Sequence, residues 1–223
     1  MARSRTLLQL RTAVRATADM VNGTFVTDSQ ILWWVNQSLN DLWEIITTAE
    51  PDRYVTESTI NAVAGTKAYA LPADFYKLRY VDLVSGSERI TCHEFMTTEK
   101  NQYQYPLGLP RPPRYNLIGA NITFEPDPGT ATYKLGYIAL FTEMTVDGST
   151  FDGIAGYEDF VVYDVAARCC DKEEATEQAA MFRAERGRIE QRIRQNAQDR
   201  DFSRAPTIGR VRYGRRHQHP LYI

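Results

Sequence analysis

The stretch that decides the fold begins Tyr157-Glu158-Asp159-Phe160-Val161-Val162-Tyr163-Asp164-Val165 and continues to Asp199. Up to Arg194 it contains no proline and a single glycine, Gly187. It is rich in alanine, glutamate, glutamine and arginine, which lose little side-chain freedom in a helix. Its apolar residues recur at close to the helical period. The sequence therefore predicts a helical region here.

A continuous helix over this span would be about 65 Å long. Because that exceeds what a compact domain of this size needs, we expect part of the span to project towards something else. The apolar stripe lapses at Cys170–Glu174, where Asp171-Lys172-Glu173-Glu174 follow one another. The sequence therefore predicts two helices, collinear or kinked at this point.

The charge of the chain changes after Asp199. The whole chain has 26 basic and 28 acidic residues, and 204–223 holds five arginines and no acid. The rest of the chain is therefore −7 and this tail +5. Its prolines and glycines disfavour a regular helix, so we predict an extended basic arm that becomes ordered on a partner. The candidate docking residues of the arm are Arg204, Arg210, Arg212, Tyr213, Arg215, Arg216, Leu221 and Tyr222.

Length and composition predict a soluble globular protein. With 223 residues, 43% of them hydrophobic and 24% charged, the chain has ample capacity for a core. No apolar run approaches the ~18–20 residues of a membrane span, and we expect no secretory signal. The adjacent cysteines Cys169 and Cys170 point about 100° apart on a helix, and no C-x-x-C pattern is present. We expect neither a zinc nor a redox site, and synthesis in a reducing cytoplasm.

Two helices are expected before residue 50. The first spans Ser4–Val21, with Ser4 as its N-cap. The second begins with a capping box, in which Thr27 serves one free backbone amide and Gln30 reaches back to another. It continues to about Ala49. Its expected buried stripe is Ile31, Trp34/Val35, Leu39, Leu42 and Ile46.

From Tyr54 the apolar period changes to two, which is typical of strands. Strands are expected at 54–60, 68–71, 76–84, around 90, and at 114–117, 122–125 and 133–140. Glu94–Lys100 is expected to form one or two helical turns, and Gln104–Pro113 a proline-rich loop.

These patterns predict an α+β fold: a helical bundle of two N-terminal helices plus a long C-terminal helix, with an inserted all-β sandwich or barrel of about six strands. An extended C-terminal arm follows the bundle. The predicted division is 1–53 for the N-terminal helices, 54–152 for the β domain, 153–200 for the C-terminal helix and 201–223 for the basic docking arm.

The search for catalytic and ligand-binding motifs is mostly negative. The sequence has no glycine-rich phosphate loop, no Gly-x-Ser-x-Gly elbow and no His-Glu-x-x-His helix. A structural role is favoured for His93 over a metal ligand, and His217 and His219 lack further ligands in the arm. The carboxylates Asp74, Asp82, Glu94 and Glu99 are scattered, so a solvated surface is favoured over a glycosidase pair. We expect no enzyme activity, no cofactor and no metal.

Several runs carry a resemblance to a known family. They are Tyr69-Ala70-Leu71-Pro72-Ala73-Asp74-Phe75, then Leu109-Pro110-Arg111-Pro112-Pro113-Arg114-Tyr115, and then Ile118-Gly119-Ala120-Asn121-Ile122-Thr123-Phe124-Glu125-Pro126-Asp127-Pro128. Together with Gly156-Tyr157-Glu158-Asp159-Phe160 and the helix after it, this ordered set resembles the adaptor, or head-completion, proteins of tailed bacteriophages. The tail tubular and tail accessory proteins of short-tailed phages are similar in outline.

The resemblance implies a structural protein of the virion neck, made in the host cytoplasm. It implies a ring of twelve copies beneath the portal protein, which joins the capsid to the tail or nozzle protein and continues the DNA exit channel. Genomic DNA would pass without sequence-specific binding, and no membrane is involved. The arm would reach the portal while the β domain faces the tail. Trp33, Trp43, Tyr105 and Arg111 are candidates for a ring or tail interface; for the two tryptophans, core packing is favoured and an interface is the alternative.

Two other functions stay open from the sequence. In the first, the arginines of the arm and the interleaved Tyr213 bind nucleic acid by neutralising phosphates. The negative charge of the rest of the chain argues against a broad DNA footprint. In the second, the protein is a virion-associated peptidoglycan hydrolase that uses Glu94 or Glu99.

Overall fold

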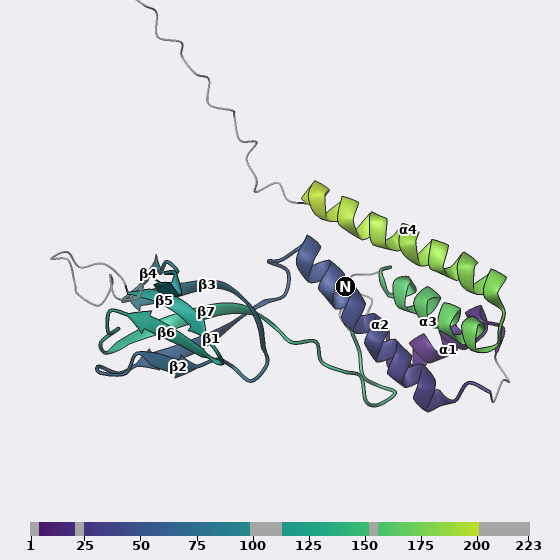
Figure 1. The fold of residues 1–223 in the computed structure, drawn as a ribbon, viewed down its shortest axis with the longest axis horizontal. Helices are drawn as coiled ribbons and strands as arrows, with labels where there is room; N and C mark the ends of the chain where they lie inside the picture. The colour runs from purple at the N-terminus through teal and green to yellow at the C-terminus, as the bar shows by residue number, and fades with distance from the viewer. Residues whose placement is uncertain (1–4, 21–24, 99–112, 152–155, 201–223) are drawn as a thin grey trace, which may run out of the picture.

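The computed structural model describes residues 5–20, 25–98, 113–151 and 156–200, with the backbone alone at 197–200. In chain order the elements are α1 (Leu7–Thr17), α2 (Asp28–Ala49), β1 (Val55–Ala62), β2 (Ala68–Ala70), β3 (Phe75–Ser85), β4 (Glu88–Thr91), β5 (Arg114–Ile118), β6 (Asn121–Glu125), β7 (Ala131–Ala139), α3 (Glu158–Lys172) and α4 (Thr176–Arg200). The helices form one lobe and the strands a second lobe beside it (Figure 1). The predicted α+β fold is confirmed.

The N-cap of helix α1 lies two residues later than predicted. It is Thr6 and not Ser4, because Thr6 forms a capping box with Gln9. The Gln9 N–H donates to Thr6 Oγ1 at 3.3 Å, and the Thr6 N–H donates to Gln9 Oε1 at 3.0 Å. The helix ends at Thr17, before the predicted end, because Asp19 has a left-handed φ of 57° that a helix cannot continue through.

Helix α2 agrees with its prediction at both ends. Both bonds of the capping box between Thr27 and Gln30 are present, and the helix ends at Ala49. The predicted stripe Ile31, Val35, Leu39, Leu42 and Ile46 is buried, and Trp34 is half-buried against it. Through this stripe, one side of α2 forms part of the core of the helical lobe.

Helices α3 and α4 form an antiparallel hairpin. The predicted break between them is confirmed, and Glu174 has a φ of 63° at this turn. The Tyr163 and Phe182 rings stack with centroids 6.2 Å apart, and Asn196 near the end of α4 donates to the Tyr157 hydroxyl at 3.0 Å. The expectation of a collinear or merely kinked rod is wrong, because the apolar stripe of α4 packs back onto α3.

Helix α3 is the centre of the helical lobe. Ten of its fifteen residues are buried. Helices α1, α2 and α4 each pack on it. The surrounding core includes Leu10 and Val14 of α1, Leu39 and Leu42 of α2, and Ile189 and Ile193 of α4.

The strands form a sandwich of two antiparallel sheets. One sheet has the strand order β1-β7-β3-β4 and the other β2-β6-β5. Phe124 of β6 and Tyr133 of β7 meet across the two sheets with ring centroids 4.5 Å apart. The core between the sheets also contains Ile60, Val81, Tyr115, Ile122 and Leu135. It is separate from the core of the helical lobe.

Residues 92–98 differ from their prediction. Instead of starting a helical turn, Glu94 forms a parallel bridge with Tyr115 of β5. The Phe95 N–H donates to the Tyr115 carbonyl at 3.0 Å, and the Tyr115 N–H donates to the His93 carbonyl at 3.1 Å. The prediction failed because these unpaired groups of an edge strand attract a further backbone segment. A short 3₁₀ turn begins only at Thr97.

An aromatic cluster joins the two lobes. Tyr54, just before β1, has its ring 4.0 Å from the ring of Trp43 on α2. Phe151 also lies beside Trp43 in an edge-on arrangement, with ring centroids 6.3 Å apart. Arg79 of β3 pairs with Asp52 of the same connection at 2.6 Å. These contacts attach the sandwich to the end of α2.

The segment 141–151, here called the strap, follows β7 and returns along the helices (Figure 1). Its Met144 and Phe151 belong to the core of the helical lobe. The Leu7 N–H donates to the Ser149 carbonyl at 3.0 Å. The strap lies inside the predicted β domain of 54–152, and that domain division stays a prediction.

Candidate assembly surfaces

The two tryptophans named as interface candidates lie in different environments. Trp33 lies on the outer side of α2 and is 60% exposed. Trp43 is half-buried between Tyr54 and Phe151 at the joint of the lobes. Core packing therefore holds for Trp43 and is wrong for Trp33, because the outer side of α2 at that point is not covered by another described element.

The other candidate residues lie outside the described ranges. These are the eight docking residues of the arm, from Arg204 to Tyr222, the interface candidates Tyr105 and Arg111, and also Glu99, His217 and His219. The loop predicted at 104–113 is described only at Pro113. The arm follows directly on α4, which the structure describes to Arg200.

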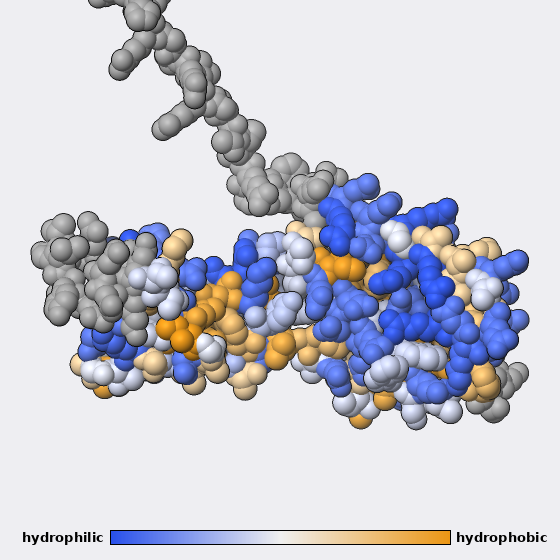
Figure 2. Space-filling view, in the orientation of Figure 1, coloured by the Kyte–Doolittle hydropathy of each residue, from blue (hydrophilic) through white to orange (hydrophobic). Residues whose placement is uncertain are grey.

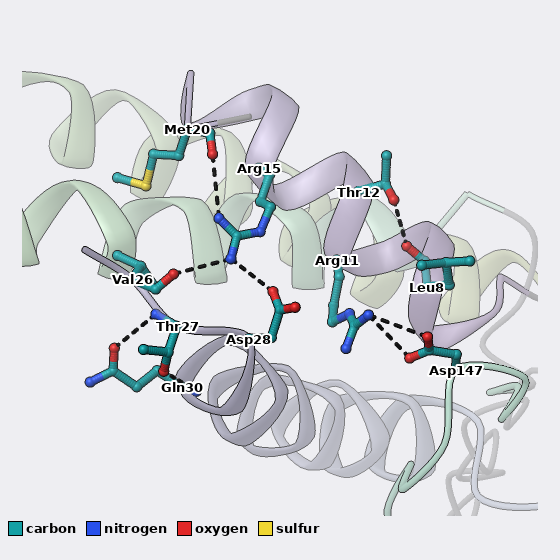
Figure 3. Close-up of polar contacts among 10 residues, drawn as sticks. All are labelled: Leu8, Arg11, Thr12, Arg15, Met20, Val26, Thr27, Asp28, Gln30 and Asp147. Atoms are coloured by element: carbon teal, nitrogen blue, oxygen red, sulfur yellow. Dashed lines mark hydrogen bonds and ion pairs between the residues drawn. The ribbon is translucent and has the colours of Figure 1, made fainter. Parts of the chain in front are cut away.

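The outer side of α2 is bordered by the strap. Asn36 of α2 donates to the Met144 carbonyl at 3.0 Å and accepts from the Met144 N–H at 2.9 Å. Arg11 of α1 pairs with Asp147 at 3.1 Å (Figure 3). The Leu8 N–H donates to the Asp147 carbonyl at 3.2 Å. The strap is thus hydrogen-bonded to both N-terminal helices, and it holds them in one position.

Arg15 fixes the connection between α1 and α2 (Figure 3). Its guanidinium donates to the carbonyls of Met20 and Val26, at 3.3 and 3.1 Å, and to the Asp28 carboxylate at 2.7 Å. The hydrogen bond from Arg15 lowers the pKa of Asp28. A lowered carboxyl pKa stabilises the folded state at neutral pH, and this contribution is lost as the pH falls below the ordinary value of 3.8.

An ion-pair network joins α2, α3 and α4. The buried Asp164 of α3 lies 3.0 Å from Arg168 and 3.3 Å from Arg186 of α4. Arg186 also lies 3.8 Å from Asp41 of α2, and its guanidinium covers the Phe160 ring at 4.7 Å. Burial, and then the nearby Asp164 charge, raise the pKa of Asp41. Two carboxylates thus share one guanidinium that anchors α4 on the bundle.

An open pocket of about 270 Å³ lies between α2 and α4, lined by Asp41, Glu44, Ile45, Thr48, Arg186, Glu190 and Arg194. Both arginines already pair with an acid of the lining, Arg186 with Asp41 and Arg194 with Glu190. Figure 2 shows a small apolar area enclosed by hydrophilic side chains on this part of the helical lobe. A shallow, open pocket whose charged side chains are already paired is typical of a solvated surface.

The outer face of the larger sheet carries a polar network across three strands. The Tyr80 hydroxyl donates to Glu57 at 2.7 Å, and Arg89 donates to the same carboxylate at 2.5 Å. The hydrogen bond from Arg89, with that from Tyr80, lowers the pKa of Glu57 to about 2. Tyr80 reaches Glu57 across β7 only because residue 136 is glycine, since a Cβ there would lie 2.3 Å from the Tyr80 ring.

Two of the candidate carboxylates, Asp74 and Asp82, lie far apart in the structure. Asp74 precedes β3 and accepts from the Tyr137 hydroxyl at 2.9 Å, whereas Asp82 lies in β3, roughly 26 Å further along the strand. Glu94 lies in the bridge to β5. A glycosidase pair has its two carboxyl groups within about 10 Å. Asp74 and Asp82 do not meet this geometry.

The cysteines are buried free thiols. Burial raises the pKa of Cys92 and of Cys169 to about 11, which keeps them protonated and poorly reactive at neutral pH. Within the described ranges, no three side chains of His, Cys, Asp or Glu gather as metal ligands. In the same part of the chain, no helix combines the length and apolar character that crossing a membrane requires.

Comparison with known proteins identifies the class. The profile of the family described as SU10 adaptor protein matches residues 5–212. The chain therefore belongs to this family, a family of phage head-to-tail adaptors, and is a structural component of the virion neck. No curated protein matched the chain. The family match includes the first part of the arm, with Arg204, Arg210 and Arg212.

Proposed function

We propose that the protein forms a ring beneath the portal, joins the capsid to the tail and continues the DNA exit channel, with the arm 201–223 docked on the portal. The observation that supports docking best is that the family match runs past Arg200, the last residue that the structure describes in α4, to residue 212. The family pattern thus includes 201–212, the first part of the proposed docking arm. A family pattern that extends into the arm supports a role that the arm shares with its relatives, and docking on a partner is the role proposed for it.

The charge distribution supports the same role for the arm. Five arginines without an acid follow a body with a charge of −7. Arginine pairs with carboxylates through two parallel hydrogen bonds, so an acidic surface of the portal would order the arm. The negative body would suit a channel in which a polyanion must slide without being held.

The ring itself is part of the proposal. The resemblance implies twelve copies, and a closed ring requires that two different surfaces of each copy meet. The β lobe would face the tail or nozzle protein. We expect a monomer in dilute solution, because much of the ring interface would form only on the portal; sedimentation that shows stable twelve-mers of the isolated protein would contradict this.

Deletion of 204–223 tests the docking role. The truncated chain should keep its fold, since both cores lie before residue 200, and it should no longer co-purify with portal rings. A matched control replaces Arg183, Arg188 and Arg192 of α4 by alanine, which removes three exposed arginines but leaves the arm. If the truncated protein still binds portal rings in a pull-down, the arm does not provide the attachment.

Binding of nucleic acid by the arm is the second candidate, favoured by its arginines and by Tyr213. Five phosphate contacts would give a slope of log K against log salt of about −4.5. Gel shifts of the full chain and of a version with the five arginines changed to alanine would detect this slope. Absence of a steep salt dependence in the wild-type chain leaves docking on a protein as the role of the arm.

A further inference from the structure

We propose that the ring contact joins two defined patches: Leu8, Trp33 and Val146 of one copy, called patch A, and Ala180, Met181 and Ala184 of the next copy, called patch B. This inference rests on the proposed ring and names the surfaces that would form it. The sequence indicated Trp33 alone among these six residues.

Patch A consists of exposed apolar side chains held on one side of the helical lobe. Leu8, Trp33 and Val146 are 49%, 60% and 64% exposed. Leu8 and Val146 are neighbours through the strap, since the Leu8 N–H binds the carbonyl of the residue after Val146. Asn36, one turn after Trp33, binds the backbone of Met144, two residues before Val146. The strap thus ties the backbone that carries Val146 both to Leu8 of α1 and to the turn of α2 after Trp33.

Patch B lies on the side of α4 that faces away from the bundle. The inner side of α4 carries Phe182, Arg186 and Ile189, which contact α3 or the core. Ala180, Met181 and Ala184 are exposed on the opposite side, Met181 at 68%. The two alanines are small, so a large ring can approach the backbone of α4 between them.

The two patches lie on different sides of the lobe, as a ring requires. Helices α1 and α4 both pack on α3. They contact each other far less than they contact α3. In Figure 1, α4 runs along the upper edge of the helical lobe and the strap along its lower edge. Figure 2 shows apolar side chains at both edges. Different surfaces on different sides produce a heterologous, repeating contact, not a two-fold dimer.

The charges next to the patches are compatible with this contact. Beside patch A, Arg11 pairs with Asp147 at 3.1 Å. Beside patch B, Arg188 pairs with Glu185 one turn before it. Each patch is therefore flanked by a charge pair that is neutralised within its own subunit, and these pairs would not have to be broken by the contact.

The size of the patches explains why a second copy is the fitting occupant. Three partly exposed side chains on each side fall well short of the roughly 800 Å² per partner of a stable complex. Such a contact is weak between free subunits and gains strength when a template holds many copies side by side. A Trp at its centre is the residue type that most often dominates a small interface.

Cross-linking of cysteine variants tests the contact. Ser29→Cys places a thiol one turn before Trp33, and Gln191→Cys places one two turns after Ala184; both positions are exposed. The native cysteines are at most 3% exposed, so a short bismaleimide should react with the new thiols alone. Concentrated full-length S29C and Q191C are mixed, and each is also treated by itself. Thr56→Cys, exposed on β1, is the matched control for Q191C.

The mixture of S29C and Q191C should give a cross-linked dimer, whereas either variant alone or S29C with T56C should not. Adding Trp33→Ala to S29C should lower the yield about tenfold or more. A dimer of S29C alone, or no dimer in the mixture, would overturn the proposed contact. Portal pull-down by the same variants reports separately on docking, so a failed contact is distinguishable from a failed adaptor role.

Discussion

Helices α3 and α4 come from one proline-free stretch and lie against each other, yet their surroundings are opposite. Ten of the fifteen residues of α3 are buried, including the polar Glu158 and Asp164. Over 176–196 of α4, burial is limited to Ala179, Ile189 and Ile193. Helix α3 is covered by three other helices, whereas α4 packs on α2 and α3 along one side, and no other described element packs on its opposite side to a similar extent.

This difference in burial assigns the two helices different roles: α3 supports the stability of the fold, and the outer side of α4 is available for assembly. A helix that is buried on nearly all sides can change only at a cost to folding. A helix that is buried along one stripe can vary its outer side without affecting the core, and that side is available to a partner. We therefore expect changes in α3 to act on stability, and changes on the outer side of α4 to act on assembly.

The largest expected effect is the loss of the Phe160 ring in α3, which is fully buried. Phe160→Ala should reduce the free energy of unfolding by about 3–5 kcal/mol, because it leaves a cavity under the Arg186 guanidinium. Met181→Ala on α4 is the control and should change it by less than about 0.5 kcal/mol. Urea unfolding of both variants gives the comparison. Equal losses would mean that α4 is as buried as α3 in solution.

An intermediate effect is expected at the ion pairs that join the two helices. Asp164→Asn removes the charge that Arg168 and Arg186 share, at a cost of about 1–3 kcal/mol. Glu190→Gln, in a pair within α4 alone, should cost less than about 0.5 kcal/mol. Similar costs for both changes would argue that Asp164 contributes no more than a surface pair.

Asp164→Asn should also shift the pKa of Asp41. The Asp164 charge helps to raise the pKa of Asp41, so Asp164→Asn should lower this pKa towards its ordinary value of 3.8. In the wild type the raised pKa means that Asp41 contributes less stability as the pH rises above 3.8. NMR titration of the Asp41 carboxyl, with Asp147→Asn as a distant control, measures the change.

The smallest effect is expected at the turn between the helices. Glu174 has a φ of 63°, a conformation that costs a side-chain-bearing residue about 1–2 kcal/mol and glycine very little. Glu174→Gly should therefore stabilise the protein by about 0.5–1 kcal/mol, after the flexibility of glycine in the unfolded chain is counted. Glu173→Gly, where φ is −91°, should destabilise it. Thermal unfolding of the two variants measures both changes in stability. If both variants change the stability in the same direction, Glu174 is not strained.

Most of the elements could be predicted from the sequence. The capping box at Thr27 and Gln30 and the end of α2 at Ala49 agree with the structure, because capping depends on residues three positions apart. The strands were located by their period of two, and the break near Glu174 by the loss of apolar residues. The box at Thr6 and Gln9 is equally local, but the sequence prediction places the cap two residues too early, at Ser4.

The candidate surfaces were less predictable. Trp33 and Trp43 have similar positions beside the same stripe, yet one is exposed and the other contacts Tyr54 and Phe151. The helical period could have placed Met181 on the outer side of α4, opposite Ile189 and Ile193. No period could have brought Val146 next to Leu8, because the strap joins them from positions far apart in the sequence.

The sequence by itself determined the elements, their caps and the separation of an acidic body from a basic arm, because these depend on neighbours within a few residues or on composition alone. Only the tertiary structure decided that α4 folds back on α3, that the strap binds the N-terminal helices and that Trp33 stays exposed. The reason is physical: a residue's period shows which side of an element is apolar. Which distant segment covers that side depends on the packing of the whole chain.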